Sequence, residues 1–248
     1  MKVTHQTVAQ YIDHMGSDLT VVNAARASFN RQKNTHLDSA DTKLIKFLAR
    51  GYRTQEWDEL ANEFMRAECS KDVKAMLTEF KRHAQHWAPF AHPHVQLRVE
   101  MPVFLARQFV KHQIGGTWSE VSRRYVSDEP TFWFPNEWHT RPADIKQGSG
   151  DAVSNQALVN TISSNAVETA LNAYRMLLNE GVAPEEARTV LPLNHMTTVV
   201  WTGSLLFWSR VVNQRADGHA QLAAQSLAAQ ISDIIEPLFP VSWKALTE

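Results

Sequence analysis

Residues 95–114 read VQLRVEMPVFLARQFVKHQI, and this stretch decides the fold class. In its first seven residues apolar and polar side chains alternate without exception, which predicts a β-strand with one buried face. Pro102 ends that strand and suits the first turn of a helix, which we expect over 103–114. The glycine pair at 115–116 then breaks the helix. A strand followed directly by a helix indicates a mixed α and β protein.

The rest of the chain has mainly helical patterns. We expect helices at 41–50, 54–88, 152–180, from 184, 195–216 and 218–235, with a short element at 119–126. Asp41 and Ser70 are candidate helix caps. The aromatic and proline-rich range 130–142 predicts an irregular loop, and 147–150 resembles a linker. Strand content is therefore low, and we predict one α+β domain over 1–248, with a small, mostly antiparallel sheet flanked by several long helices.

Composition excludes several classes of protein. The 248 residues carry 25 Lys and Arg against 26 Asp and Glu, a net charge of −1, and 44% are apolar. A disordered chain would have fewer apolar residues and more net charge, and a strongly basic nucleic-acid binder is disfavoured by the charge balance. Cys69 is the single cysteine, so an internal disulfide and a multi-cysteine metal site are both excluded.

Two features of the sequence bear on the cellular location of the protein. The first residues contain no apolar segment typical of a signal peptide, and the lone cysteine fits a reducing compartment, so we expect a cytoplasmic protein. The range 189–209 has no charged side chain, but it contains proline, asparagine and histidine. We therefore interpret it as the start of a buried helix and not as a membrane span.

The range 107–125, RQFVKHQIGGTWSEVSRRY, is the first candidate for chemistry. It contains four cations and one acid, together with hydroxyl and amide donors on both sides of the glycine pair. On a helix, Arg107 and Lys111 lie one turn apart, as do Gln108 and His112. Such a set of donors suits a phosphate and a polar heterocycle. A solvated cationic surface around a turn is the alternative interpretation.

Arg215 is the second candidate, because it follows the apolar series Trp201, Leu205, Trp208 and Val212. An arginine beside a core-facing stripe needs a partner, so it is either ion-paired or a ligand contact. Glu168 and Glu180 are the acids that could pair with it.

Other sites are less strongly indicated. Arg188 fits a surface position on a short amphipathic helix. Four histidines, at 83, 86, 92 and 94, could bind zinc, but no cysteine or acid stands at a recognised spacing from them, so we expect no metal. The chain contains no G-x-S-x-G, G-x-G-x-x-G or P-loop sequence, which excludes a nucleophile elbow and a Rossmann turn.

The range 111–125, KHQIGGTWSEVSRRY, resembles the signature of the flavin-dependent thymidylate synthases, R-H-R, seven residues, then Ser. Four further segments resemble family segments in the family's order. They are VVNAARASF at 21–29, HWAPF at 86–90 followed by PVFLARQ at 102–108, ARTVLPLN at 187–194, and RADGHAQ at 215–221. Together they cover about residues 20–225, and in this order they are specific to the family.

The chain departs from the family signature at a few positions. Lys111 and Gln113 stand where the two arginines of R-H-R stand, and Ser119 replaces the usual asparagine. The interval from His112 to Ser122 is one residue longer than the common spacing. This variant resembles viral and phage members of the family, for which the location would be the host cytoplasm.

The resemblance implies a reaction and an assembly. The enzyme would convert dUMP to dTMP with methylenetetrahydrofolate as carbon donor, NADPH as reductant and FAD as bound cofactor, without an enzyme cysteine as nucleophile. The family works as a homotetramer with active sites built between subunits, and it needs neither a membrane nor a nucleic acid.

The resemblance also implies roles for individual residues. Arg215, with Ser122, is implied as catalytic, since an arginine at the ring edge can stabilise negative charge that develops on the uracil. The residues implied in dUMP binding are Arg107, Gln108, Glu120, Ser122, Arg123, Arg124, Arg188 and Arg215. The residues implied in FAD binding are His86, Ala88, Lys111, His112, Gln113, Glu120, Ser204, Arg210 and His219.

Two alternatives remain open from the sequence. One is a different NADPH-oxidising flavoprotein on the same scaffold. The other is a helical RNA- or DNA-binding protein that uses Lys111, Arg123 and Arg124, although the near-neutral charge argues against it.

Overall fold

The computed structural model describes residues 1–30, 34–50, 66, 73, 86–142 and 148–248. The predicted strand is β3 (His94–Pro102), and its side chains alternate between partly exposed and buried, with Val95, Leu97 and Val99 fully buried. β3 lies in a four-stranded antiparallel sheet of order β2 (Val8–Met15), β3, β6 (Met196–Ser204), β4 (Gly116–Glu120).

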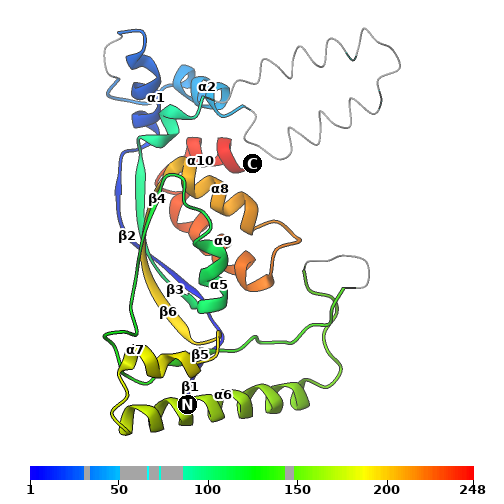
Figure 1. Ribbon diagram of the computed structural model, residues 1–248. Coiled ribbons are helices and arrows are strands. Elements are labelled where there is room, and N and C mark those ends of the chain that lie inside the picture. The colour runs from blue at the N-terminus through cyan, green and yellow to red at the C-terminus, as the bar shows by residue number, and fades with distance from the viewer. Residues whose placement is uncertain (31–33, 51–65, 67–72, 74–85, 143–147) are drawn as a thin grey trace.

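Helices cover the buried face of this sheet. They are α5 (Val103–Phe109), α8 (Leu205–Arg215) and α9 (Leu222–Ile235), and α10 (Pro240–Thr247) packs against α8. Figure 1 shows α5, α8 and α9 on the same side of the strands. Trp201 of β6 lies at the centre of the core, with its ring centroid 4.9 Å from those of Trp118 and Trp208 and 5.2 Å from that of Phe207. Aromatic rings in edge-on contact therefore join the sheet to α8.

The helix predicted over 195–216 is wrong in its first half, because 196–204 form strand β6. This segment is rich in β-branched residues and is paired on both sides, along its full length with β3 and over 199–203 with β4. Apolar side chains lie on both faces of β6, with the exposed Val200 between the buried Val199 and Trp201. The sequence therefore does not alternate cleanly, and its length and apolarity misled the prediction. The uncharged range 189–209 thus contains strand β6 and the first turn of α8. Within the described residues no helix is long and apolar enough to cross a membrane.

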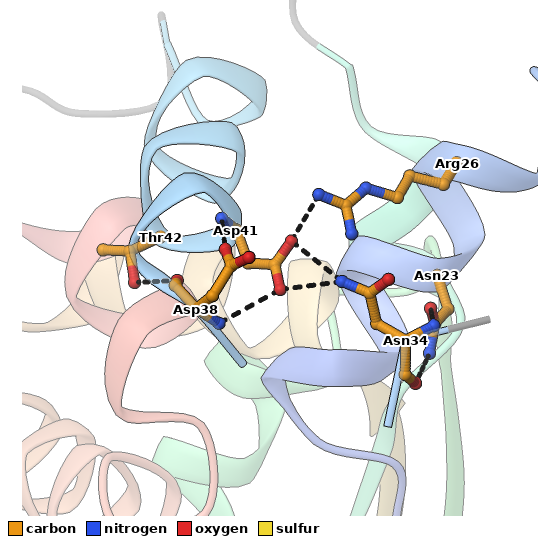
Figure 2. A network of polar contacts seen from close by, with 6 residues as sticks. All are labelled: Asn23, Arg26, Asn34, Asp38, Asp41 and Thr42. Carbon is orange, nitrogen blue, oxygen red and sulfur yellow. Dashed lines mark hydrogen bonds and ion pairs between the residues drawn. The ribbon is translucent and has the colours of Figure 1, made fainter. Parts of the chain in front are cut away.

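The first two helices, α1 (Asp18–Ala27) and α2 (Ser39–Leu48), are joined by a polar network (Figure 2). The fully buried carboxylate of Asp41 lies 2.5 Å from the Arg26 guanidinium and accepts a hydrogen bond of 2.9 Å from Asn34 Nδ2. The prediction that Asp41 caps α2 is wrong, because Asp38 is the cap and Asp41 occupies the third position of the capping box. A buried charge needs several partners, and these contacts supply them.

A second, smaller core lies beneath the sheet in Figure 1. It packs the two-stranded parallel sheet of β1 (Lys2–Thr4) and β5 (Thr131–Trp133) against α6 (Gln156–Asn179). The long helix predicted to end near Gly181 is confirmed, and Gly181 has a φ of +82°. The helix predicted from 184 is α7 (Pro184–Ala187), continued by the 3-10 turn η2 (Arg188–Val190).

Several predicted boundaries need correction. Helix α5 ends at Phe109 and not at 114, and α9 starts at Leu222 and not at 218. The short element expected at 119–126 is the end of β4 followed by a turn, and the loop expected at 130–142 contains β5. Most of the helix predicted over 54–88, with Ser70 and Cys69, lies outside the described residues, and 88–91 form the 3-10 turn η1 (Ala88–Ala91). The predicted class, an α+β fold with a small antiparallel sheet flanked by helices, is confirmed.

Two facing glycines explain how α8 lies so close to the sheet. Gly116 and Gly203 are opposite each other on β4 and β6, and the ring of Phe207 lies over both. A Cβ atom would stand 2.1 Å from Phe207 Cδ1 at Gly203 and 2.6 Å from Phe207 Cε2 at Gly116. The missing side chains therefore form the slot that accepts Phe207.

We expect Gly203→Ala to lower the free energy of unfolding by about 1–3 kcal/mol, because the added methyl group overpacks the slot. Urea denaturation measures this change. Gly218→Ala is the control, since a Cβ there meets nothing within 4 Å and should change stability by less than about 0.5 kcal/mol. Equal stability of the two variants would contradict the role of the slot.

Candidate functional site

Arg215 ends α8 at the point where α5 also ends, and two contacts fix its side chain. Nε donates a hydrogen bond of 3.1 Å to His112 Nε2, and Nη2 donates one of 3.1 Å to the backbone oxygen of Gln108. Its guanidinium carbon lies 5.7 Å from the centroid of the Phe109 ring. The alternative of a salt bridge to Glu168 or Glu180 is wrong, since no ion pair of Arg215 occurs among the described residues. The arginine is thus held by neutral groups, and its charge is not cancelled.

His112 is neutral in this arrangement. Burial and the neighbouring Arg215 charge lower the pKa of the imidazole to about 4. Because Nε2 accepts the hydrogen bond from Arg215, the ring proton is assigned to Nδ1. Burial also lowers the pKa of Arg215, which still remains far above neutral pH for a guanidinium.

Polar side chains surround this arginine. Gln108 Nε2 donates to Gln221 Oε1 at 2.8 Å, and His219 Nδ1 lies 2.9 Å from Asp217 Oδ1. Asp217 also accepts the backbone N–H of His219, and these bonds hold the pKa of its carboxyl below the usual range. A cavity of about 310 Å³ is lined by Arg215, Asp217 and His219. We call this set the Arg215 group.

A second set of predicted residues lies around a cavity of about 690 Å³, whose lining includes Glu120, Arg123, Arg188 and His195. Glu120 ends β4, and its two carboxylate oxygens accept bonds from Thr197 Oγ1 at 2.7 Å and from Trp118 Nε1 at 3.3 Å. Arg123 Nη1 donates to the backbone oxygen of Asp128 at 2.9 Å. We call this set the Arg188 group.

Glu185 joins one further predicted arginine, Arg124, to Arg188 at the same place. Its carboxylate lies 3.1 Å from Arg124 Nε, and its backbone oxygen accepts a bond of 3.1 Å from Arg188 Nε. Both side chains of the Arg124–Glu185 pair are about half exposed, so an anionic ligand can compete for Arg124. Ser122 Oγ accepts the backbone N–H of Arg124 at 3.3 Å, and among the described residues no imidazole bonds to this hydroxyl.

The two groups are separate within one chain. Their cavities share no lining residue, and no hydrogen bond or ion pair between described residues connects them. Figure 1 shows α7, next to Arg188, and the end of α8 at different sides of the molecule. One chain therefore does not bring all the predicted arginines to one place.

The remaining predicted residues are more scattered. Lys111, Gln113 and Arg107 are exposed near the Arg215 group, and Arg210 is exposed on α8. Ser204 is 5% exposed, and its hydroxyl caps α8 by accepting the N–H of Phe207 at 3.2 Å. His86 and Ala88 are exposed at η1, where the His86 ring lies 5.6 Å from that of Phe47.

No metal site is found in the part of the chain that the structure describes. His86, His92 and His94 belong to that part, whereas His83 lies outside it. His195 is not among the predicted site residues, because the sequence predicts that a helix begins there. Its position directly after the segment 187–194 is the signal that could have indicated it.

The chain matches a family model described as "Thymidylate synthase complementing protein" over residues 10–241. A flavin-dependent thymidylate synthase of Wolbachia pipientis is 30% identical, over 100% of this chain and 76% of that protein. One of Thermosipho africanus is 28% identical, over 98% of this chain and 92% of the relative. Among solved structures, the UMP/dUMP methylase PolB of Streptomyces cacaoi has a TM-score of 0.77 at 23% identity, covering 99% of this chain and 96% of that one. This last likeness concerns the fold.

The contact between Arg215 and His112 predicts a measurable proton equilibrium. We expect the His112 pKa to be about 4 and to rise in Arg215→Gln, because the repulsion by the guanidinium is lost while burial persists. Arg215→Lys retains a positive charge and should keep the pKa low. An NMR titration of the His112 ring protons measures all three proteins, and an unchanged pKa in Arg215→Gln would contradict the contact.

The same pKa fixes a stability trend. In the unfolded chain the imidazole has a pKa of about 6.5, whereas in the folded protein its pKa is about 4. Between these two pH values the unfolded state binds a proton at His112 and the folded state does not. His112 therefore lowers stability as the pH falls from about 6.5 to 4, and His112→Gln should remove this contribution.

Proposed function

The chain belongs to the family of flavin-dependent thymidylate synthases, and we propose the following substrates and residue roles for its reaction. The enzyme methylates dUMP to dTMP, with methylenetetrahydrofolate as the carbon donor and NADPH as the reductant of a bound FAD. The observation that carries this proposal is the Arg215 guanidinium, which is held by a backbone carbonyl and a neutral imidazole and has no acidic partner among the described residues.

An uncompensated guanidinium suits the chemistry of the uracil ring. To react at C5, the ring must carry more negative charge on N3 and O2 than it does in free dUMP. Arg215 stabilises that charge, and its two fixed contacts reduce the reorganisation needed when the charge develops. The only cysteine, Cys69, lies outside the described residues, and the proposed reaction does not require it.

The Arg188 group supplies the phosphate contacts. Arg124 and Arg188 are joined through Glu185, and Arg123 reaches the adjoining cavity. Guanidinium groups form paired hydrogen bonds with phosphate oxygens, so a nucleotide phosphate can replace the exposed Glu185 carboxylate at Arg124. Ser122 adds a hydroxyl donor to this set. Gln108 and Arg107 are assigned to the uracil end of the nucleotide, with the Arg215 group.

The described residues fit a flavin dinucleotide. Lys111 and Arg210 are exposed cations that make no ion pair in the described part of the chain, and Gln113 and His219 lie near Lys111 and Arg215. Cations without acidic partners suit the two phosphates of FAD. When bound, the flavin supplies the two-electron reduction that completes the methyl group. Ser204 contributes by capping α8, and His86, Ala88 and Glu120 complete the proposed set.

The separation of the two groups supports an active site assembled between subunits of a homotetramer. Within one chain the Arg215 group and the Arg188 group use different cavities, yet the reaction needs ring and phosphate contacts on one nucleotide. We propose that two protomers each contribute one group. Each chain acts as one domain, because contacts join its two cores. The ring centroids of Phe104, of the larger core, and Trp133 lie 5.5 Å apart, and the Val103 N–H donates to the His195 backbone oxygen at 3.0 Å.

Arg215→Ala should reduce dTMP formation by about 100-fold or more, because a charge-stabilising donor is lost from the reacting ring. Flavin should remain bound, as judged from the absorption spectrum. Arg141→Ala, at an exposed arginine with no hydrogen bond or ion pair in the described chain, should keep full activity. Tritium release from C5-labelled dUMP distinguishes the synthase from an NADPH-oxidising flavoprotein, since only the synthase releases tritium in a folate-dependent way. A colourless protein without flavin would refute the proposal.

Mixing two impaired variants, assayed at a dUMP concentration that does not saturate Arg124→Ala, tests the shared site. Arg124→Ala should weaken dUMP binding, and Arg215→Ala should block the chemical step. If the subunits are unfolded and reassembled together at equal amounts, about one quarter of the sites receive both intact groups and activity returns to about that level. The double variant mixed with itself is the control and should stay inactive. No recovery in mixed tetramers would contradict a site made by two protomers.

A further inference from the structure

His195 is a partly buried histidine in the cavity of the Arg188 group, and the sequence motifs do not include it. It lines this cavity together with Glu120, Arg123 and Arg188. Its backbone is fixed on both sides, because its oxygen accepts the N–H of Val103 at 3.0 Å and the residue forms an isolated β-bridge with Phe132. The ring therefore projects from a rigid position between α5 and the start of β6.

One hydrogen bond determines which ring nitrogen carries the proton. His195 Nδ1 lies 2.8 Å from the backbone oxygen of Pro192. A carbonyl oxygen only accepts hydrogen bonds, so the proton is assigned to Nδ1. In the neutral ring Nε2 is then a hydrogen-bond acceptor.

The surroundings keep this ring neutral. Burial lowers the His195 pKa, and the charges of Arg123 and Arg188 lower it further, against the opposing effects of the Pro192 bond and Glu120. The other charged groups that line the cavity are Lys2, Arg98, Glu100, Asp128 and Glu129.

The acceptor nitrogen is available to a ligand. Nε2 makes no hydrogen bond in the described part of the chain. Among the described residues, the side-chain atoms that are fully buried and lack a hydrogen-bond partner belong to Tyr174, Asn194 and Ser242. His195 Nε2 is not one of them, so it is not fully buried. It is therefore open to the cavity that the ring lines.

His195 Nε2 adds a neutral acceptor to this cavity beside two groups that can only donate. The guanidiniums of Arg123 and Arg188 only donate, and each carboxylate oxygen of Glu120 already accepts one bond. At neutral pH, dUMP has two strong donors, the N3–H of the uracil and the 3′-hydroxyl of the sugar. We propose that His195 is a substrate-binding residue whose Nε2 accepts a hydrogen bond from one of these two donors. This inference rests on the proposed function, because it takes dUMP as the ligand of the cavity.

Variants at position 195 separate the acceptor from the structural bond. His195→Asn keeps a donor for the Pro192 oxygen and lacks an acceptor at the Nε2 position. We expect it to fold normally and to bind dUMP about fivefold to tenfold more weakly, the loss typical of one hydrogen bond. His195→Gln and His195→Met form a second, matched pair of similar size. Only Gln places an oxygen near the former Nε2, so Gln should bind dUMP more tightly than Met by a similar factor.

Two analogues identify the donor. N3-methyl-dUMP lacks the N3–H and 2′,3′-dideoxyuridine monophosphate lacks the 3′-hydroxyl. One of these analogues lacks the donor that His195 engages, and it should bind the wild type more weakly than dUMP does. In His195→Asn this loss of affinity should be about fivefold to tenfold smaller, because the variant and the analogue remove the same hydrogen bond. Equilibrium titration of the flavin-loaded protein provides all the dissociation constants.

The outcomes separate the inference from the function on which it rests. If His195→Asn binds dUMP as the wild type does, or if neither analogue shows the smaller loss, the role of His195 is refuted while the proposed function stands. Equal affinities of the Gln and Met variants would refute it in the same way. If the wild-type protein does not bind dUMP at all, the proposed function fails and this inference fails with it.

Discussion

The pairing of β6 with β3 on one side and β4 on the other is the constraint on which the structure depends. This strand carries Trp201, the centre of the aromatic core, and Gly203, which makes room for Phe207. Its two ends lead to the two proposed halves of the active site. His195 directly precedes the strand and lines the cavity of the Arg188 group, whereas Ser204 ends it and caps α8, whose last residue is Arg215. A shift of β6 would therefore misplace both groups of arginines.

Each group combines unpaired or weakly paired cations with a histidine that is kept neutral. In the Arg215 group the arginine donates to His112, and in the Arg188 group His195 lies near Arg123 and Arg188. Burial and guanidinium charge lower the pKa of both histidines. A neutral imidazole leaves the arginine charge available to an anionic ligand and adds an acceptor that arginines cannot supply. The arrangement thus suits a ligand that carries a phosphate, a ring that becomes negative and one or two donors.

Local sequence patterns predicted the elements whose environment is simple. The strand at 95–101 has one buried and one open face, so the alternation of its residues was sufficient to predict it. The long surface helix α6 ends at a glycine, so its helical pattern and that glycine were sufficient. The same patterns placed a helix where β6 lies, because the outward face of this strand also carries apolar side chains, those of Met196 and Val200, which hide the alternation. They also gave no indication of β2, whose edge position leaves most of its side chains exposed.

The sequence by itself determined the family, the α+β class and the identity of the candidate cations, because these follow from the order of short motifs and from local alternation. Only the tertiary structure decided how those cations are distributed, with Arg215 in one cavity and Arg188 in another. It also decided that Arg215 contacts His112 and not an acid, and that His195 turns an accepting nitrogen toward the second cavity. The physical reason is that these properties depend on contacts that no local pattern of residues reveals. The environment of the Arg215 charge depends on a contact with His112, about 100 positions away, and the tautomer of His195 depends on a turn of the backbone at Pro192.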